Sequence, residues 1–122
     1  MPTPDLARLR HIWDAAAGAR ALAQGRIRAD LDRNRLLNLA LVRLLEIIGE
    51  AANGLSPELR AAHPQVPWHR MIGMRNRLVH AYFDINLDIV WETVQQDLPP
   101  LMGALDQIIR QEEACCPRTT SL

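Results

Sequence analysis

The chain has 122 residues, of which 48% are hydrophobic and 4% aromatic, and its 14 basic residues are balanced by 14 acidic ones. This length supports one domain with a real core, and the hydrophobic content excludes a largely disordered chain. Because the formal net charge is zero, no overall field draws the protein onto nucleic acid, and any anion-binding site must be local.

The order of apolar residues, caps and prolines predicts helices and no strands. The expected segments are residues 5–23, residues 30 or 32 to 53, residues 57–62, a segment that starts near 68, and residues 86 or 87 to 113. Gly54 should end the second segment, and Ser56 should cap the third. Pro99 and Pro100 should kink the last one or restart it, with Asp97 as the new cap. We therefore expect an all-α, up-and-down bundle of four or five helices over residues 1–115, with a flexible tail at 116–122.

The second segment is apolar nearly all the way round. Its apolar residues are Leu36, Leu37, Leu39, Leu41, Val42, Leu44, Leu45, Ile47 and Ile48. A helix of this kind is buried on more than one side. Either the other helices enclose it, or it forms the surface of a homodimer, in which Gly49 would let a helix of the second copy approach closely. We favour the homodimer, since two-fold dimers are common. Arg43, Glu46 and Glu50 in its interior argue against a membrane span.

The segment that starts near Trp68 carries the most informative pattern, R-x4-H-x-Y, formed by Arg75, His80 and Tyr82. An arginine can contact a phosphate through two N–H groups, and a histidine can move protons near neutral pH. Together they suit phosphodiester cleavage. No acidic residue occurs at 59–83, a window that holds Arg60, His63, His69, Arg70, Arg75, Arg77 and His80. This window is either a local phosphate-binding patch or an ordinary solvated helix face.

Helical geometry restricts how these residues can meet. Arg75 and Tyr82 fall on nearly the same face, whereas His80 lies about 140° from Arg75. The three converge only if the helix ends near His80; alternatively, Asn76 and His80 share a face at i, i+4. The four histidines have no metal-ligand spacing, and no glycine-rich phosphate loop is present, so we expect neither a metal nor a cofactor. Glu46 and Glu50 are expected to pair with arginines.

Several blocks in order resemble the HepT-like toxins of the HEPN superfamily. They are residues 44–52 (LLEIIGEAA), 55–59 (LSPEL), 67–68 (PW), 72–83 (IGMRNRLVHAYF), 89–91 (IVW) and 97–99 (DLP), and the resemblance covers about residues 30–110. It implies an all-helical homodimer that cleaves RNA without a metal at a composite site in the dimer cleft. Arg75 and His80 would be catalytic, with Asn76 and Arg77 in support. Tyr82 would be the residue that a minimal nucleotidyltransferase antitoxin silences by adding AMP.

The expected function is therefore the endoribonuclease toxin of a toxin–antitoxin pair, with RNA such as tRNA or mRNA as its substrate. We expect a cytoplasmic protein, because no signal peptide is recognised and the adjacent Cys115 and Cys116 cannot form an internal disulfide framework. One alternative is a non-catalytic helical module that binds nucleotide or docks on a nucleotidyltransferase. Another is a purely structural helical dimer. The sequence does not separate the toxin from the binding module, because both need phosphate contacts.

Overall fold

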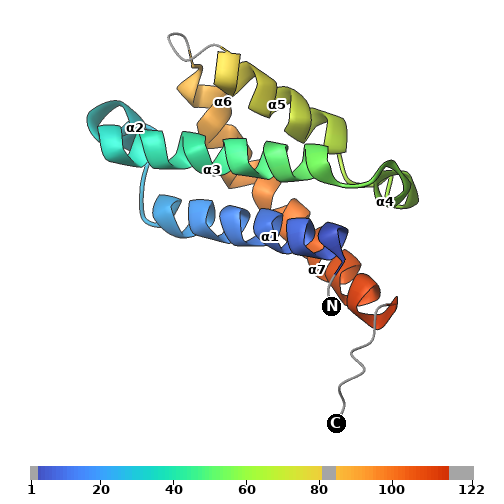
Figure 1. Ribbon diagram of the computed structural model, residues 1–122. Helices are drawn as coiled ribbons and strands as arrows, with labels where there is room; N and C mark the ends of the chain where they lie inside the picture. The colour runs from blue at the N-terminus through green and yellow to red at the C-terminus, as the bar shows by residue number, and fades with distance from the viewer. Residues whose placement is uncertain (1–2, 81–84, 116–122) are drawn as a thin grey trace.

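The computed structural model describes residues 3–80 and 85–115, and these residues form helices and no strand. In chain order (Figure 1) the elements are α1 (Pro4–Ala23), α2 (Asp30–Arg33), α3 (Arg35–Gly54), α4 (Pro57–Ala62), α5 (Trp68–His80), α6 (Leu87–Glu92), the π-helical turn η1 (Thr93–Asp97) and α7 (Leu98–Cys115). The expectation of an all-α fold is confirmed. Within these ranges no helix is long and apolar enough to cross a membrane. The predicted tail, residues 116–122, lies outside the described residues.

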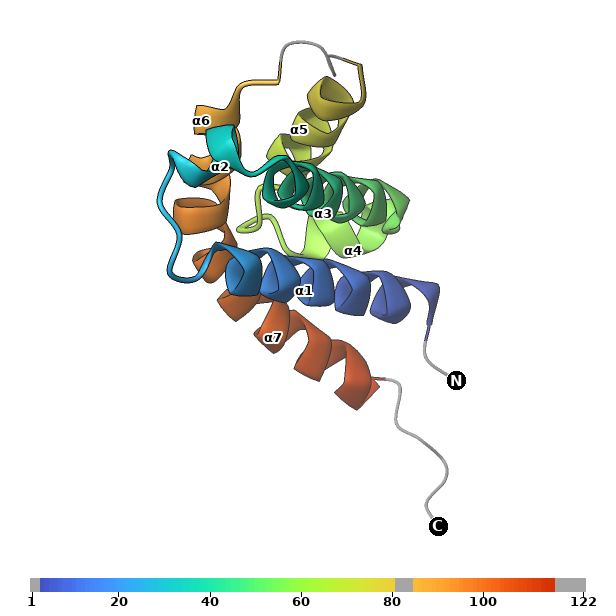
Figure 2. The same ribbon diagram turned by 90° about the vertical axis from the view of Figure 1, so that its left-hand side faces the viewer.

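Helix α3 occupies the middle of the bundle. Figures 1 and 2 show α1 along one side of α3 and α5 along the other, while α6, η1 and α7 form one long rod that crosses the bundle. The first part of this rod packs against α3, and the last part packs against α1. Helix α3 is thus in contact with α1, α5 and the first part of the rod, which makes it the element that positions the others.

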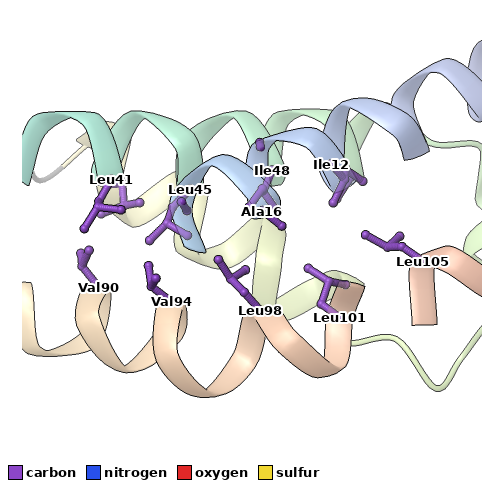
Figure 3. Packing of buried hydrophobic residues seen from close by; sticks show 14 of the residues in the cluster. Ile12, Ala16, Leu41, Leu45, Ile48, Val90, Val94, Leu98, Leu101 and Leu105 are labelled. Atoms are coloured by element: carbon purple, nitrogen blue, oxygen red, sulfur yellow. The ribbon is translucent and has the colours of Figure 1, made fainter. Parts of the chain in front are cut away.

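The hydrophobic core lies where α1 and α3 meet this rod (Figure 3). The labelled side chains are Ile12 and Ala16 of α1, Leu41, Leu45 and Ile48 of α3, and Val90, Val94, Leu98, Leu101 and Leu105 of the rod. Each is at least nine-tenths buried. Full burial of one large aliphatic side chain contributes about 1.5–3 kcal/mol, so this seam is a principal source of stability.

The structure explains most of the apolar pattern of α3 within one chain. Leu41, Leu45 and Ile48 are buried by neighbouring helices, as the enclosed-helix interpretation requires. Leu36 and Leu39 are different, because they remain 80% and 50% exposed. The case for a homodimer therefore depends on these two leucines and not on the whole helix.

The second predicted helix is in fact two helices, α2 and α3, because the helical backbone is interrupted at Asn34. Asn34 has an extended backbone (φ −117°, ψ 98°), and its side-chain oxygen accepts a hydrogen bond from the Leu37 N–H at 3.1 Å. This is the geometry of a helix N-cap. The prediction of one segment from residue 30 or 32 was wrong, since Asn34 ends the short α2 and begins α3.

The predicted restart at the two prolines was also wrong. Asp97 does not cap a new helix; it belongs to the π-helical turn η1, and the chain stays helical through Pro99 and Pro100. The Leu98 N–H donates to the Thr93 carbonyl oxygen, five residues earlier. A π turn is wider than an α turn, so it leaves room for proline rings that would clash with carbonyl groups of a regular helix.

This wide turn leaves the Val94 carbonyl without an obvious backbone donor. The Leu98 N–H donates to the Thr93 carbonyl oxygen instead, and Pro99 has no N–H. Arg20 of α1 supplies the missing donor: its Nη1 lies 3.2 Å from the Val94 oxygen and 3.1 Å from Oε1 of Gln95. A long-range side-chain contact thus satisfies the backbone where the rod changes its helical form.

The short α4 begins as the sequence predicts. Ser56 Oγ accepts a hydrogen bond from the Leu59 N–H at 3.1 Å, and Pro57 holds the first helical position. Ser56 also donates twice to Asp5 of α1, from its N–H at 2.9 Å and from its hydroxyl at 2.6 Å. These contacts connect the turn between α3 and α4 to the start of α1.

Candidate active site

Helix α5 carries the predicted catalytic motif. It begins at Trp68, whose side chain is buried and whose Nε1 donates to the His63 carbonyl oxygen at 2.9 Å. Its described part reaches His80. The side chain of His80 and all of Tyr82 lie outside the described residues, so the convergence itself stays a prediction.

Helix α5 crosses α3 at Gly49, and the contact is exceptionally close. A Cβ built on Gly49 would lie 2.7 Å from the Met71 carbonyl oxygen and 3.0 Å from Cγ of Arg75, and closer still to Cβ of Arg75. No side chain fits in this space without moving α5. The close approach predicted for a second copy is therefore made by α5 of the same chain, and it presses the stem of Arg75 onto α3.

The guanidinium of Arg75 lies between two polar groups. Its Nη1 donates to Oδ1 of Asn76 at 2.8 Å, and its Nη2 lies 3.9 Å from Oε1 of Glu50 on α3. The Arg75 side chain is 29% exposed and that of Glu50 is 44% exposed. Nε of Arg75 is buried without a hydrogen-bond partner among the described residues. Arg75 is thus a partly accessible cation, held by its neighbours yet still able to contact an anion.

The expectation that Glu46 and Glu50 pair with arginines is confirmed. Glu50 pairs with Arg75, and Glu46 pairs with Arg43 at 3.3 Å on the same helix. Helix α3 therefore carries two acidic side chains one turn apart, of which Glu50 alone pairs with the motif.

The acid-free window does not form an uninterrupted cationic patch. Arg70 lies 3.3 Å from Asp97 of η1, and Arg75 lies near Glu50 of α3. Both acids come from distant parts of the sequence, so the window cannot reveal them. The cationic character of this window is correspondingly weaker than the sequence suggests, because two of its four arginines have acidic partners.

Arg77 lies on another side of α5. It lines a groove of about 630 Å³ that α5 forms with η1 and α7, together with residues that include Val66, Met71, Met74, Thr93, Leu98 and Leu101. Neither Arg75 nor Asn76 lines this groove. The described residues thus bring Arg75 and Asn76 together and leave Arg77 apart from them. The predicted cleft that joins Arg75 and Asn76 to His80 across a dimer stays a prediction.

The sequence of the chain also matches a known protein family. The sequence profile of the family described as "Ribonuclease HepT-like" matches residues 12–108, which include the whole of α5 and the α3 crossing. The chain belongs to this family. A protein named "Putative RNase TTE0752" from Caldanaerobacter subterraneus subsp. tengcongensis is 42% identical over 84 residues, which cover 69% of this chain and 75% of that protein. "Probable ribonuclease HepT" from Thermococcus cleftensis is 41% identical over 69 residues, which cover 57% and 63% of the two chains. No solved structure matches the chain significantly.

Membership in the ribonuclease HepT-like family confirms the resemblance seen in the sequence and the class of enzyme, a ribonuclease. Among residues 3–80 and 85–115, no group of three or more His, Cys, Asp or Glu side chains is arranged to hold a metal ion. Independence from metal stays a prediction, as do the roles of Arg75 and His80.

The sequence interpretation missed the role of Gly49 in shaping the site. A glycine inside a helix that is otherwise rich in leucine and isoleucine costs about 0.5–1 kcal/mol relative to alanine, so it usually has a packing reason. That signal was available, but it does not tell which helix makes the approach. Only the fold shows that this helix is α5 and that the residue in contact is Arg75.

Proposed function

We propose that this protein is the toxin of a toxin–antitoxin pair and cleaves RNA in the cytoplasm without a metal, with Arg75 and His80 as its catalytic residues. The observation that carries the proposal is the position of Arg75: its stem is fixed at the α3 crossing, and its guanidinium is partly exposed beside Asn76. Arg75 lies five residues before His80 on the same helix.

The chemistry needs few protein groups, because RNA carries its own nucleophile. The 2′ oxygen attacks the adjacent phosphorus, the bond from phosphorus to the 5′ oxygen breaks, and the products are a 2′,3′-cyclic phosphate and a free 5′-hydroxyl. His80 would move a proton, and Arg75 would hold the non-bridging oxygens while charge builds on them. Proton transfer of this kind is worth roughly 10²–10⁴-fold in rate, and loss of one preorganised donor costs about 10²–10³-fold.

We further propose a composite site in which two copies of His80 face each other across a homodimer. One histidine would remove the proton from the 2′-hydroxyl while the other protonates the leaving oxygen. The exposed Leu36 and Leu39 on α3 support a second copy at this face, since large apolar side chains gain stability when a partner covers them.

Regulation would act at Tyr82, two residues after His80. Addition of AMP to its hydroxyl by a minimal nucleotidyltransferase would bring negative charge and bulk beside the catalytic residues. The added phosphate would then compete with RNA for Arg75. This part of the proposal rests on the resemblance of the sequence to HepT-like toxins.

The test uses purified wild-type protein and a mixed RNA substrate, with and without EDTA. Cleavage that resists EDTA and leaves cyclic phosphate ends is the expected result. His80→Ala and Arg75→Ala should each lower the rate by at least about 10²-fold, whereas Arg60→Ala on α4 is the control and should not. A requirement for a divalent cation contradicts the mechanism. RNA or nucleotide binding without cleavage would favour the non-catalytic module instead.

A further inference from the structure

The immediate neighbours of Arg75 on α3 are Gly49 and Glu50, which are consecutive residues. Gly49 receives the Cβ and Cγ atoms of Arg75, and Glu50 faces its guanidinium with Nη2 to Oε1 at 3.9 Å. Asn76 accepts a hydrogen bond from the other terminal nitrogen, Nη1, at 2.8 Å. One turn of α3 and one residue of α5 therefore fix both the base and the tip of this side chain.

We propose that Glu50 is a positioning residue that orients the guanidinium of Arg75 for contact with the RNA phosphate. The inference rests on the proposed function of Arg75 and goes beyond it. Glu50 itself would not touch the RNA. Its carboxylate would bias the direction in which the terminal N–H groups of Arg75 point before substrate arrives.

The geometry of the pair suits orientation better than tight binding. A separation of 3.9 Å is longer than a hydrogen bond, and both side chains are partly solvated. Exposed ion pairs of this kind are weak. A phosphate can accept two parallel N–H bonds from one guanidinium, which makes it a stronger partner than a single distant carboxylate. RNA can therefore displace Glu50 without a large penalty.

This role predicts that loss of the Glu50 charge lowers the cleavage rate without weakening RNA binding. In Glu50→Gln the negative charge that competes with phosphate is gone, so RNA should bind as well as before or more tightly. The guanidinium would at the same time lose the charge that orients it. Misplacement of a reacting group by about 1 Å can cost roughly 10²-fold in rate, and a partial loss of orientation should cost about tenfold. If the role of Glu50 is purely structural, Glu50→Gln should instead lower the melting temperature and reduce RNA affinity and cleavage rate together.

The chain offers a matched control in Glu46, which lies one turn earlier on α3 and pairs with Arg43 at 3.3 Å. We would compare Glu50→Gln with Glu46→Gln in the purified protein. Single-turnover cleavage of an RNA oligonucleotide gives the rate, and its 2′-deoxy analogue at the cleaved position gives the affinity. Glu50→Gln should cleave about tenfold more slowly, with an unchanged melting temperature and no loss of affinity. Glu46→Gln should match the wild type.

A double-mutant cycle completes the test. If Glu50 acts through Arg75, then Glu50→Gln should have no further effect on the cleavage rate in an Arg75→Ala background. Wild-type cleavage that needs Arg75 but is unchanged by Glu50→Gln overturns this inference alone. A slower rate that persists undiminished in the Arg75→Ala background also overturns it. A wild-type protein that does not cleave RNA overturns the proposed function and this inference together.

Discussion

The close helix crossing makes Gly49→Ala a test of the whole α3–α5 arrangement. Intrinsic helix propensity alone favours alanine over glycine by about 1 kcal/mol. Against this, the new methyl carbon would lie 2.7 Å from the Met71 carbonyl oxygen and closer still to Cβ of Arg75, whereas ordinary contact begins at 3.4 Å, so the two helices must separate by more than about 0.7 Å. Backbone atoms and the base of the Arg75 side chain cannot rotate away. Overpacking of this kind costs about 1–3 kcal/mol. After the gain in helix propensity is subtracted, we expect a net loss of up to about 2 kcal/mol in the free energy of unfolding.

Urea unfolding followed by far-ultraviolet circular dichroism measures this difference from the transition midpoint and its slope. Gly103→Ala on α7 is the matched control, because a Cβ at Gly103 meets nothing within 4 Å. It should raise stability by about 0.5–1 kcal/mol. The two substitutions thus have opposite expected signs for the same chemical change. If Gly49→Ala stabilises the protein as much as Gly103→Ala does, then α5 does not pack closely on α3 at Gly49, and the contact between Arg75 and Gly49 is contradicted.

Three further substitutions test other contacts. Arg20→Met keeps the apolar stem but leaves the Val94 carbonyl without its donor, so urea unfolding should show a loss of about 1–3 kcal/mol. Ser56→Ala removes two contacts of the hydroxyl, the cap of α4 and the bond to Asp5, and the same assay should show a loss of about 1–2 kcal/mol. The loss should be smaller when Asp5→Ala is already present, because only the cap is then left to remove. Leu36→Glu should leave stability within about 0.5 kcal/mol, because the side chain is exposed. It should nevertheless shift the mass measured by light scattering from dimer to monomer; an unchanged dimer would exclude this face as the interface.

The sequence predicted correctly those helix starts that depend only on a capping side chain and the residues next to it. Ser56 and Asn86 both cap helices in the structure, because a cap needs only a side-chain oxygen and the next few N–H groups. Asn34 has the same capacity and was missed, since the surrounding residues continue a helical pattern on both sides. The π turn η1 was missed for a different reason: the donor that satisfies its Val94 carbonyl oxygen is Arg20, which is more than seventy residues away in the sequence.

In the candidate site, too, contacts between sequence neighbours could be predicted and contacts between helices could not. The motif residues Arg75 and Asn76 are neighbours in sequence, and their contact was within reach of sequence reasoning. The pairing of Arg75 with Glu50 and its approach to Gly49 depend on how α5 lies across α3, which no spacing within one helix reveals. The acid-free window misled for this reason, because an acid that neutralises a patch can come from any part of the chain.

The π turn η1 sets the rotational phase between the two ends of the rod. Upstream of it, Val90 faces α3, and downstream of it Leu101 and Leu105 are buried toward α1 (Figure 3). A π turn closes its hydrogen bond one residue later than an α turn, so each of its residues advances the helix by less than the roughly 100° of an α-helix. Removal of one residue from η1 would let this turn close as an α turn, with the apolar seam of α7 still facing α1. The rings of Pro99 and Pro100 would then meet carbonyl groups of the preceding turn. The extra residue in η1 therefore preserves the apolar seam while making room for the two prolines.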